Sequence, residues 1–152
     1  RSRLGGCPRV WQRAFSRIDV DPPPYHGCFL HRDFHPGNVL FDRAAVTGIV
    51  DWVETSWGPP DLDVAHCCTA LALLHGPTAG ERMRAAYHDA GGRLATDPTE
   101  QAYWELIDAV GFLPDPEKVA RPWRESGHRD LGADRARERL ETYVADILAR
   151  AA

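Results

Sequence analysis

Residues 28–50 contain three short apolar segments, and polar stretches separate them. The segments 28–30, 39–41 and 46–50 each have the length and composition of a β-strand. Because only residues 42–45 connect the second and third segments, these two strands are predicted to form a hairpin. Such a hairpin would place Asp33 and Asn38, in the loop before it, near Asp51, which follows its last strand.

Together these three side chains offer two carboxylates and one amide oxygen. Oxygen ligands of this kind suit Mg²⁺, which proteins usually hold through one or two carboxylates together with the phosphates of a substrate. They suit zinc poorly, since zinc prefers nitrogen and sulfur ligands. The loop and the hairpin are therefore predicted to form a magnesium site that a nucleotide completes.

Three blocks of the sequence also resemble a known family. Residues 31–40 read HRDFHPGNVL, residues 49–52 read IVDW, and residues 58–65 read GPPDLDVA. The first two follow the order of the catalytic and metal-binding loops of kinases: His-x-Asp, four residues, Asn, and then a strand that ends in Asp. All three are similar to blocks of the aminoglycoside phosphotransferase family, although Pro59 stands where that family commonly has Asp.

The resemblance implies a role for each of these loop residues. Asp33 would be the catalytic base that accepts or orients the proton of the attacking hydroxyl. Asn38 and Asp51 would hold the Mg²⁺ ions that bridge the phosphates of ATP or another nucleoside triphosphate. Three further residues are expected to support the loop instead of touching the substrate: His31, His35 and Asp63.

Residues 1–30 differ from what a kinase carries ahead of its catalytic loop. A kinase needs a glycine-rich phosphate loop and a strand lysine there. This stretch contains no lysine, and Gly5-Gly6 is its only glycine pair. We therefore expect the chain to be the C-terminal lobe of a protein-kinase-like fold, with the N-terminal nucleotide lobe absent and needed as a partner.

The remaining sequence is predicted to be mainly helical. Apolar periodicity and capping residues favour helices near 8–18, 78–90, 97–111 and 134–148, and the apolar run 62–74 favours a buried helix. Thr78 to Glu81 matches a capping box, Asp97 fits an N-cap, and residues 112–130, which contain three prolines, are predicted to be irregular. The expected fold class is mostly α with a small β-hairpin (α+β), in a single domain of 152 residues.

Composition argues against several classes of partner. The net charge is −4 and the 18 basic residues are dispersed, which disfavours a surface for nucleic acid. No apolar run approaches the length of a membrane span. The cysteines show no CxxC spacing, which favours buried thiols in a reducing cytoplasm over disulfides or a zinc site. They are Cys7, Cys28, Cys67 and Cys68.

The leading hypothesis is ATP-dependent transfer of the γ-phosphoryl group to a hydroxyl of a small molecule. The resemblance implies an aminoglycoside antibiotic or a related sugar or amino alcohol as the acceptor. The chain alone is expected to be inactive, because no loop or lysine would cover the nucleotide. A cationic acceptor would favour an acidic wall, for which five residues are candidates: Glu100, Glu105, Asp108, Asp115 and Glu117.

Two other functions fit parts of the same sequence. One is a binding or structural remnant of a kinase-like protein that transfers no phosphate. The other is a metallohydrolase, because His31, Asp33 and His35 alternate and would point to one side of a strand. Nitrogen-rich ligation of that kind would suit zinc or iron, although Pro36-Gly37 favours a turn at this point.

Overall fold

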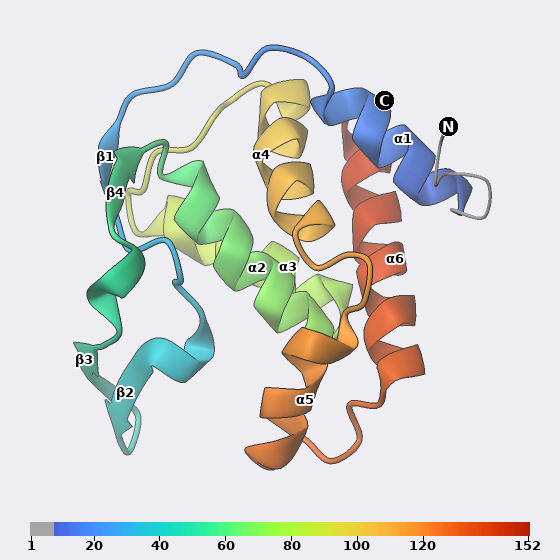
Figure 1. The fold of residues 1–152 in the computed structure, drawn as a ribbon. Coiled ribbons are helices and arrows are strands. Elements are labelled where there is room, and N and C mark those ends of the chain that lie inside the picture. Colours follow the sequence, from blue (N-terminus) through green and yellow to red (C-terminus); the bar gives the residue numbers. More distant parts are fainter. Residues whose placement is uncertain (1–7) are drawn as a thin grey trace.

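The computed structural model describes residues 8–152, and helices make up most of this part of the chain (Figure 1). Two ribbons of paired strands and two short 3₁₀ turns complete its regular structure. The predicted mostly helical content is therefore confirmed. None of the helices described here is long and apolar enough to cross a membrane. The helices are α1 (Arg9–Ile18), α2 (Asp61–His75), α3 (Pro77–Asp89), α4 (Pro98–Val110), α5 (Glu117–Glu125) and α6 (Ala133–Arg150).

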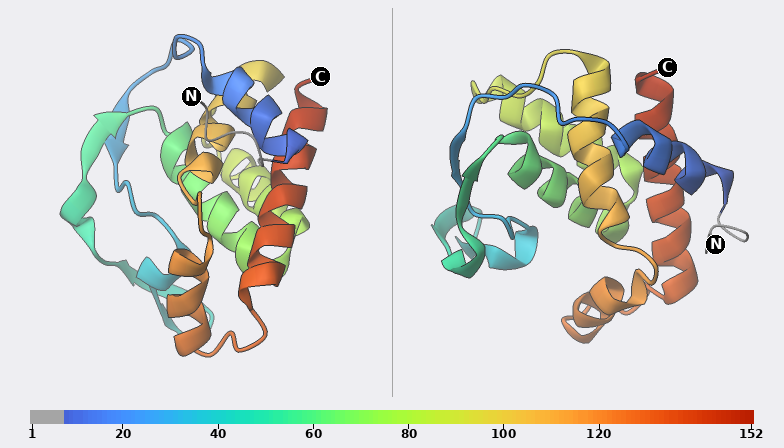
Figure 2. Two further views of the ribbon diagram at one scale, coloured as in Figure 1. Left: turned by 45° about the vertical axis from the view of Figure 1, so that its right-hand side comes forward. Right: turned by 45° about the horizontal axis from the view of Figure 1, so that its top comes forward.

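Helix α2 runs through the middle of the molecule and packs against α3, α4 and α6 (Figure 2). Ten of its 15 residues are buried, because its sequence is apolar nearly all round. Trp11 of α1, Leu106 of α4 and Leu140 of α6 belong to the same core. The prediction of a buried helix over residues 62–74 is confirmed, and the first turn of α2 carries Asp63 to the edge of this core.

The strands lie together on the side of the molecule away from α6 (Figure 1). Strand β2 (Val39–Asp42) pairs with β3 (Ala45–Ile49), which confirms the predicted hairpin. Strand β1 (Cys28–Leu30) pairs with β4 (Ser56–Gly58). The sequence did not predict β4, because three residues are too few to show a readable alternation. The β1–β4 pair closes the base of the excursion that contains the loop of residues 31–38 and the hairpin.

One predicted helix start is confirmed and another is wrong. The carboxylate of Asp97 caps α4, since it accepts hydrogen bonds from the backbone N–H groups of Thr99 and Glu100 at 2.8 and 3.2 Å. The capping box predicted at Thr78 is wrong. Helix α3 begins one residue earlier, at Pro77 after Gly76, and a proline in the first helical position has no N–H that needs a cap.

Helix α5 contradicts the prediction that residues 112–130 are irregular. The helix forms although Pro122 lies inside it. Arg124 ties it down through an ion pair with Glu117 and a hydrogen bond to the carbonyl oxygen of Leu131 at 3.0 Å. Ala120 is buried in the core. The ion pair lies within the helix, while the burial of Ala120 and the bond to Leu131 anchor it to the rest of the protein, and together these contacts outweigh the destabilising effect of an interior proline.

Cys67 and Cys68 are expected to resist alkylation in the native protein. Both thiols are buried on α2. Burial raises the pKa of Cys67 to about 11, and it raises the pKa of Cys68 as well, so that little reactive thiolate is present near neutral pH. Pulse labelling with iodoacetamide, read by mass spectrometry, should modify the partly exposed Cys28 first. Equal rates for these three thiols before unfolding in urea would contradict this; Cys7 lies outside the described residues.

Candidate active site

The loop of residues 31–35 is tied to the first turn of α2. The carboxylate of Asp63 accepts hydrogen bonds from the backbone N–H groups of His31 at 2.7 Å and of Arg32 at 2.8 Å. Arg32 has a left-handed backbone conformation, with φ 73°, which a residue other than glycine keeps only where its surroundings hold it. Asp63 thus fixes the backbone immediately before Asp33.

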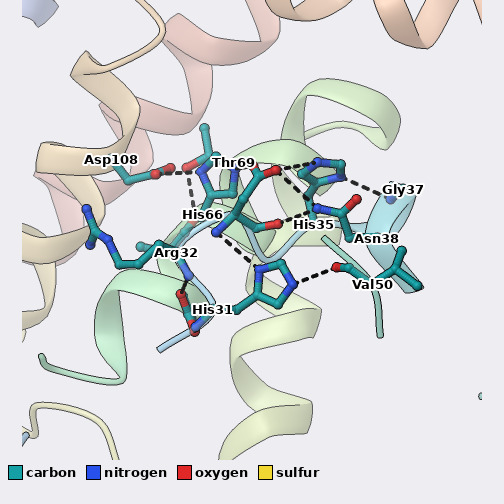
Figure 3. Close-up of polar contacts among 12 residues, drawn as sticks. His31, Arg32, His35, Gly37, Asn38, Val50, His66, Thr69 and Asp108 are labelled. Carbon is teal, nitrogen blue, oxygen red and sulfur yellow. Dashed lines mark hydrogen bonds and ion pairs between the residues drawn. The ribbon is translucent and has the colours of Figure 1, made fainter. Parts of the chain in front are cut away.

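His31 links the same loop to the end of the hairpin. Its side chain is buried, its Nδ1 accepts a hydrogen bond from the backbone N–H of Asp33 at 3.3 Å, and its Nε2 donates to the carbonyl oxygen of Val50 at 2.8 Å (Figure 3). Both ring nitrogens are therefore engaged inside the protein, and neither is free to ligate a metal.

These contacts remove the basis of the metallohydrolase interpretation. Residues 31–35 form a loop and not a strand, so the alternation of His31, Asp33 and His35 does not place them on one side. Within residues 8–152, no group of three or more His, Cys, Asp or Glu side chains is arranged to hold a metal ion. The predicted Mg²⁺ site is not such a group of three side chains. It would consist of one amide oxygen, one carboxylate and the phosphates of a nucleotide, and its protein ligands would not be the two histidines.

Asn38 holds the side chain of Asp33 in place. Its Nδ2 donates to the backbone carbonyl oxygen of Asp33 at 2.9 Å and to Oδ2 of the same residue at 3.1 Å. Asn38 is buried at the end of the turn η1 (Pro36–Asn38). His35 caps this turn, since its Nδ1 accepts a hydrogen bond from the backbone N–H of Gly37 at 3.1 Å. Because Nδ2 faces Asp33, the amide oxygen Oδ1 of Asn38 points away from that carboxylate.

Asp51 lies beside this pair because strand β3 returns the chain to it. The backbone N–H of Val50 donates to the carbonyl oxygen of Asn38 at 3.0 Å, and Asp51 follows in a left-handed conformation with φ 63°. Burial lowers the pKa of His35, whereas the charges of Asp33 and Asp51 both act to raise it. The structure thus brings Asp33, Asn38 and Asp51 into one region, and their roles stay predictions.

His66 of α2 joins Asp33 to Asp108 of α4, and Figure 3 shows His66 beside Asp108. Its Nε2 lies 3.3 Å from Oδ1 of Asp33, and its Nδ1 lies 2.8 Å from Oδ1 of Asp108. Burial alone would lower the pKa of His66, but the hydrogen bond and charge of Asp108, supported by Asp33, raise it above its ordinary value. This favours the imidazolium form, in which both ring nitrogens donate to carboxylates.

His66 is not among the predicted site residues, because it lies inside the apolar run 62–74, for which the pattern predicts a buried helix. A signal was nevertheless present. His66 follows Asp63 by three residues, and residues three apart share a helix face. An ionisable side chain on the helix face that meets the catalytic loop is a candidate for contact with Asp33.

Replacing His66 by glutamine is expected to destabilise the protein more at acidic pH than at alkaline pH. Because the folded pKa of His66 is raised, the folded protein binds this proton more tightly than the unfolded chain does. The resulting stabilisation is complete below the unfolded pKa of about 6.5 and is lost as the pH rises through the folded value. Urea unfolding of the wild type and His66→Gln across this range measures the effect, with the exposed His88→Gln as a control. A difference that stays constant with pH would contradict the expectation.

A cavity of about 460 Å³ opens beside Asp33. Asp33, His35 and His66 line it together with Phe112 and Trp123. The Trp123 ring lies edge-on to His35, with 5.5 Å between the ring centroids, so α5 and the catalytic loop meet at this point. A cavity of this size is suited to a small molecule.

Of the five residues predicted as candidates for an acidic wall, only Asp108 lines this cavity. Glu105 is buried in an ion pair with Arg150 at 2.8 Å, and Glu117 is paired with Arg124 on α5. Asp115 instead accepts a hydrogen bond from the backbone at the start of α5, and Glu100 lines a separate depression near the ends of α3 and α4. The sequence could not reveal the partner of Glu105, since Arg150 lies 45 residues away in the chain.

The geometry of this loop agrees with a comparison against known families. The model of the phosphotransferase enzyme family, APH, matches residues 3–106, which is more than half of the chain. The chain therefore belongs to this phosphotransferase family, and the resemblance of its three sequence blocks is confirmed. No curated protein and no solved structure matches the chain. The match ends within α4, before Phe112 and helix α5.

Proposed function

We propose that the chain is the C-terminal catalytic lobe of an ATP-dependent phosphotransferase that transfers the γ-phosphoryl group to a hydroxyl of a small molecule. One observation carries this proposal: the carboxylate of Asp33, held by Asn38, lines a cavity large enough for such an acceptor. Phosphoryl transfer depends mainly on positioning and on charge neutralisation. The carboxylate of Asp33 is held next to the candidate metal ligands and lines the cavity, so it meets the requirement for positioning.

Each loop residue then has a defined task. Asp33 accepts the proton of the attacking hydroxyl, and Asp63 and His31 hold the backbone that presents it. Asn38 and Asp51 would hold Mg²⁺, and an amide oxygen together with a carboxylate fits the ligand preference of that ion. When bound with ATP, the metal supplies neutralisation of the charge that develops on the phosphates.

The two ribbons expose large apolar side chains next to Asp51. Phe29 and Trp52 stack with 5.9 Å between their ring centroids, yet both remain exposed, as do Trp57 and Phe41. Exposed apolar patches are typical of contact surfaces. We propose that a nucleotide-covering lobe of a longer parent protein packs on this face and encloses ATP against Asp51. Buried free thiols and the use of ATP suit the reducing cytoplasm.

Two forms of the protein test this function: the 152-residue chain and the longest reading frame that encodes it. We expect acceptor-dependent ADP release only from a form that also carries a glycine-rich loop and a strand lysine. Acceptor-dependent ADP release from the 152-residue chain alone would refute the need for a second lobe. A parent reading frame that lacks both elements would instead favour a non-catalytic remnant.

A further inference from the structure

We infer that the acceptor is an uncharged hydroxyl compound with an extended apolar face, which inserts between α5 and the catalytic loop so that its hydroxyl meets Asp33. The inference rests on the proposed function, because it assigns the cavity beside Asp33 to the acceptor. It differs from the aminoglycoside acceptor that the sequence resemblance implies, and three observations carry it.

The first observation is the apolar character of the wall that α5 and Phe112 contribute to the cavity. Phe112, Val119, Pro122 and Trp123 line it, and Phe112 is buried and lies 6.0 Å from His66 between ring centroids. Small-molecule sites combine such apolar walls with a few polar groups that fix orientation. An aromatic or alicyclic framework would remove this wall from water, while a polycation would leave its ammonium groups against apolar carbon.

The second observation is the charge balance of the cavity. Its two carboxylates, Asp33 and Asp108, share His66 between them, and each therefore already has one oxygen engaged. Oδ2 of Asp33 also accepts a hydrogen bond from Asn38. Lys118 adds a positive charge at the rim. Among the described residues, Oδ2 of Asp108 has no hydrogen-bond partner, but it is buried away from the cavity surface. A ligand with several ammonium groups would therefore meet few accessible carboxylate oxygens here, and ammonium groups left without partners are costly to desolvate.

The third observation is the origin of the wall in the chain. The residues that shape it, from Phe112 to Trp123, lie beyond residues 3–106, which the family match covers. The family therefore accounts for the catalytic loop and for α2, whereas the acceptor surface is built from a part of the chain that the match does not reach. We therefore infer the class of acceptor from the apolar character of this surface and not from the family match.

Binding to the 152-residue chain tests the inference without any need for turnover. The neutral probe is 2-naphthaleneethanol and the polycationic probe is kanamycin, each titrated by calorimetry and checked by saturation-transfer NMR. We expect the alcohol to bind more tightly than kanamycin. Trp123→Ala should weaken alcohol binding at least about tenfold, as the loss of an aromatic anchor commonly does. The matched control is Trp57→Ala, an exposed tryptophan on β4 that does not line the cavity.

A second variant guards against misfolding of Trp123→Ala. Lys118 is exposed at the rim of the cavity, so Lys118→Glu should fold normally, and the loss of its positive charge should strengthen any kanamycin binding more than it changes alcohol binding. Failure of the alcohol to bind, tighter binding of kanamycin, or equal effects of the two tryptophan variants would overturn the inference. Alcohol binding that persists while Asp33→Asn leaves phosphoryl transfer unchanged would refute the proposed reaction instead, so the two failures are distinguishable.

Discussion

Asparagine in place of Asp33 is expected to slow phosphoryl transfer by about 10²- to 10⁴-fold, the range that a positioned general base contributes. Asparagine has nearly the size of aspartate and keeps an oxygen for the hydrogen bond from Asn38, but its amide cannot take up the proton of the acceptor hydroxyl. The measurement is kcat with ATP and acceptor in the reading frame that encodes this chain. KM for the acceptor should change little, because the lost interaction belongs to the transition state.

The matched control is Asp42→Asn, the same chemical change at an exposed position at the end of β2. It should leave kcat within about twofold, since surface substitutions away from a site seldom matter. An Asp33→Asn enzyme with the kcat of the wild type would exclude Asp33 as the base for any acceptor. A loss of activity that Asp42→Asn shares would point to misfolding, which circular dichroism would reveal.

Local sequence patterns were sufficient for the loop, the hairpin and the central helix. The strands β2 and β3 are consecutive and joined by two residues, so their pairing follows from short-range composition alone. The buried helix α2 was predictable because apolar residues on every face admit only one environment. The clustering of Asp33, Asn38 and Asp51 then follows, since one turn and one hairpin separate them in the chain.

What sequence could not supply depends on contacts between distant residues. His66 acquires its place in the site only because α4 brings Asp108 against it, 42 residues later. From the sequence, Glu105 is a candidate for an acidic wall, but in the folded protein its carboxylate forms an ion pair with Arg150. A single sequence records neither pairing, because the charge of a residue says nothing about which partner the fold will give it.

Helix α5 shows the same limit for secondary structure. Its proline content argues against a helix on local grounds, and the helix exists because Ala120 is buried and Arg124 is bound to Glu117 and Leu131. The error matters for function, since α5 supplies Trp123 to the wall of the cavity. The loop of residues 31–38 could thus be inferred from the sequence, while the part of the cavity wall that α5 contributes could not.

Asp63→Ala is expected to lower the free energy of unfolding by about 2–4 kcal/mol. Hydrogen bonds to a charged acceptor contribute about 1.5–3 kcal/mol each, and this carboxylate accepts two, but relaxation of the left-handed backbone at Arg32 recovers about 1–2 kcal/mol. Asp63→Asn is the matched control. Its amide keeps one acceptor oxygen but cannot accept from both N–H groups, so an intermediate loss is expected. Urea unfolding monitored by tryptophan fluorescence measures all three proteins, and a loss below about 0.5 kcal/mol for Asp63→Ala would show that these bonds do not hold the loop.

A double-mutant cycle with Arg32→Gly separates the bonds of Asp63 from the strain they maintain. At φ 73° an arginine is disfavoured by about 1–2 kcal/mol, whereas glycine is not. When Asp63 is replaced, a loop that contains Arg32 can relax and lose its backbone strain. A loop with the Arg32→Gly substitution has no such strain, so it gains nothing by relaxing. Asp63→Ala should therefore cost about 1 kcal/mol more in the Arg32→Gly background than in the wild type. Strictly additive effects would mean that Arg32 keeps its left-handed conformation without help from Asp63, and the loop would then owe its shape to His31 and Asn38.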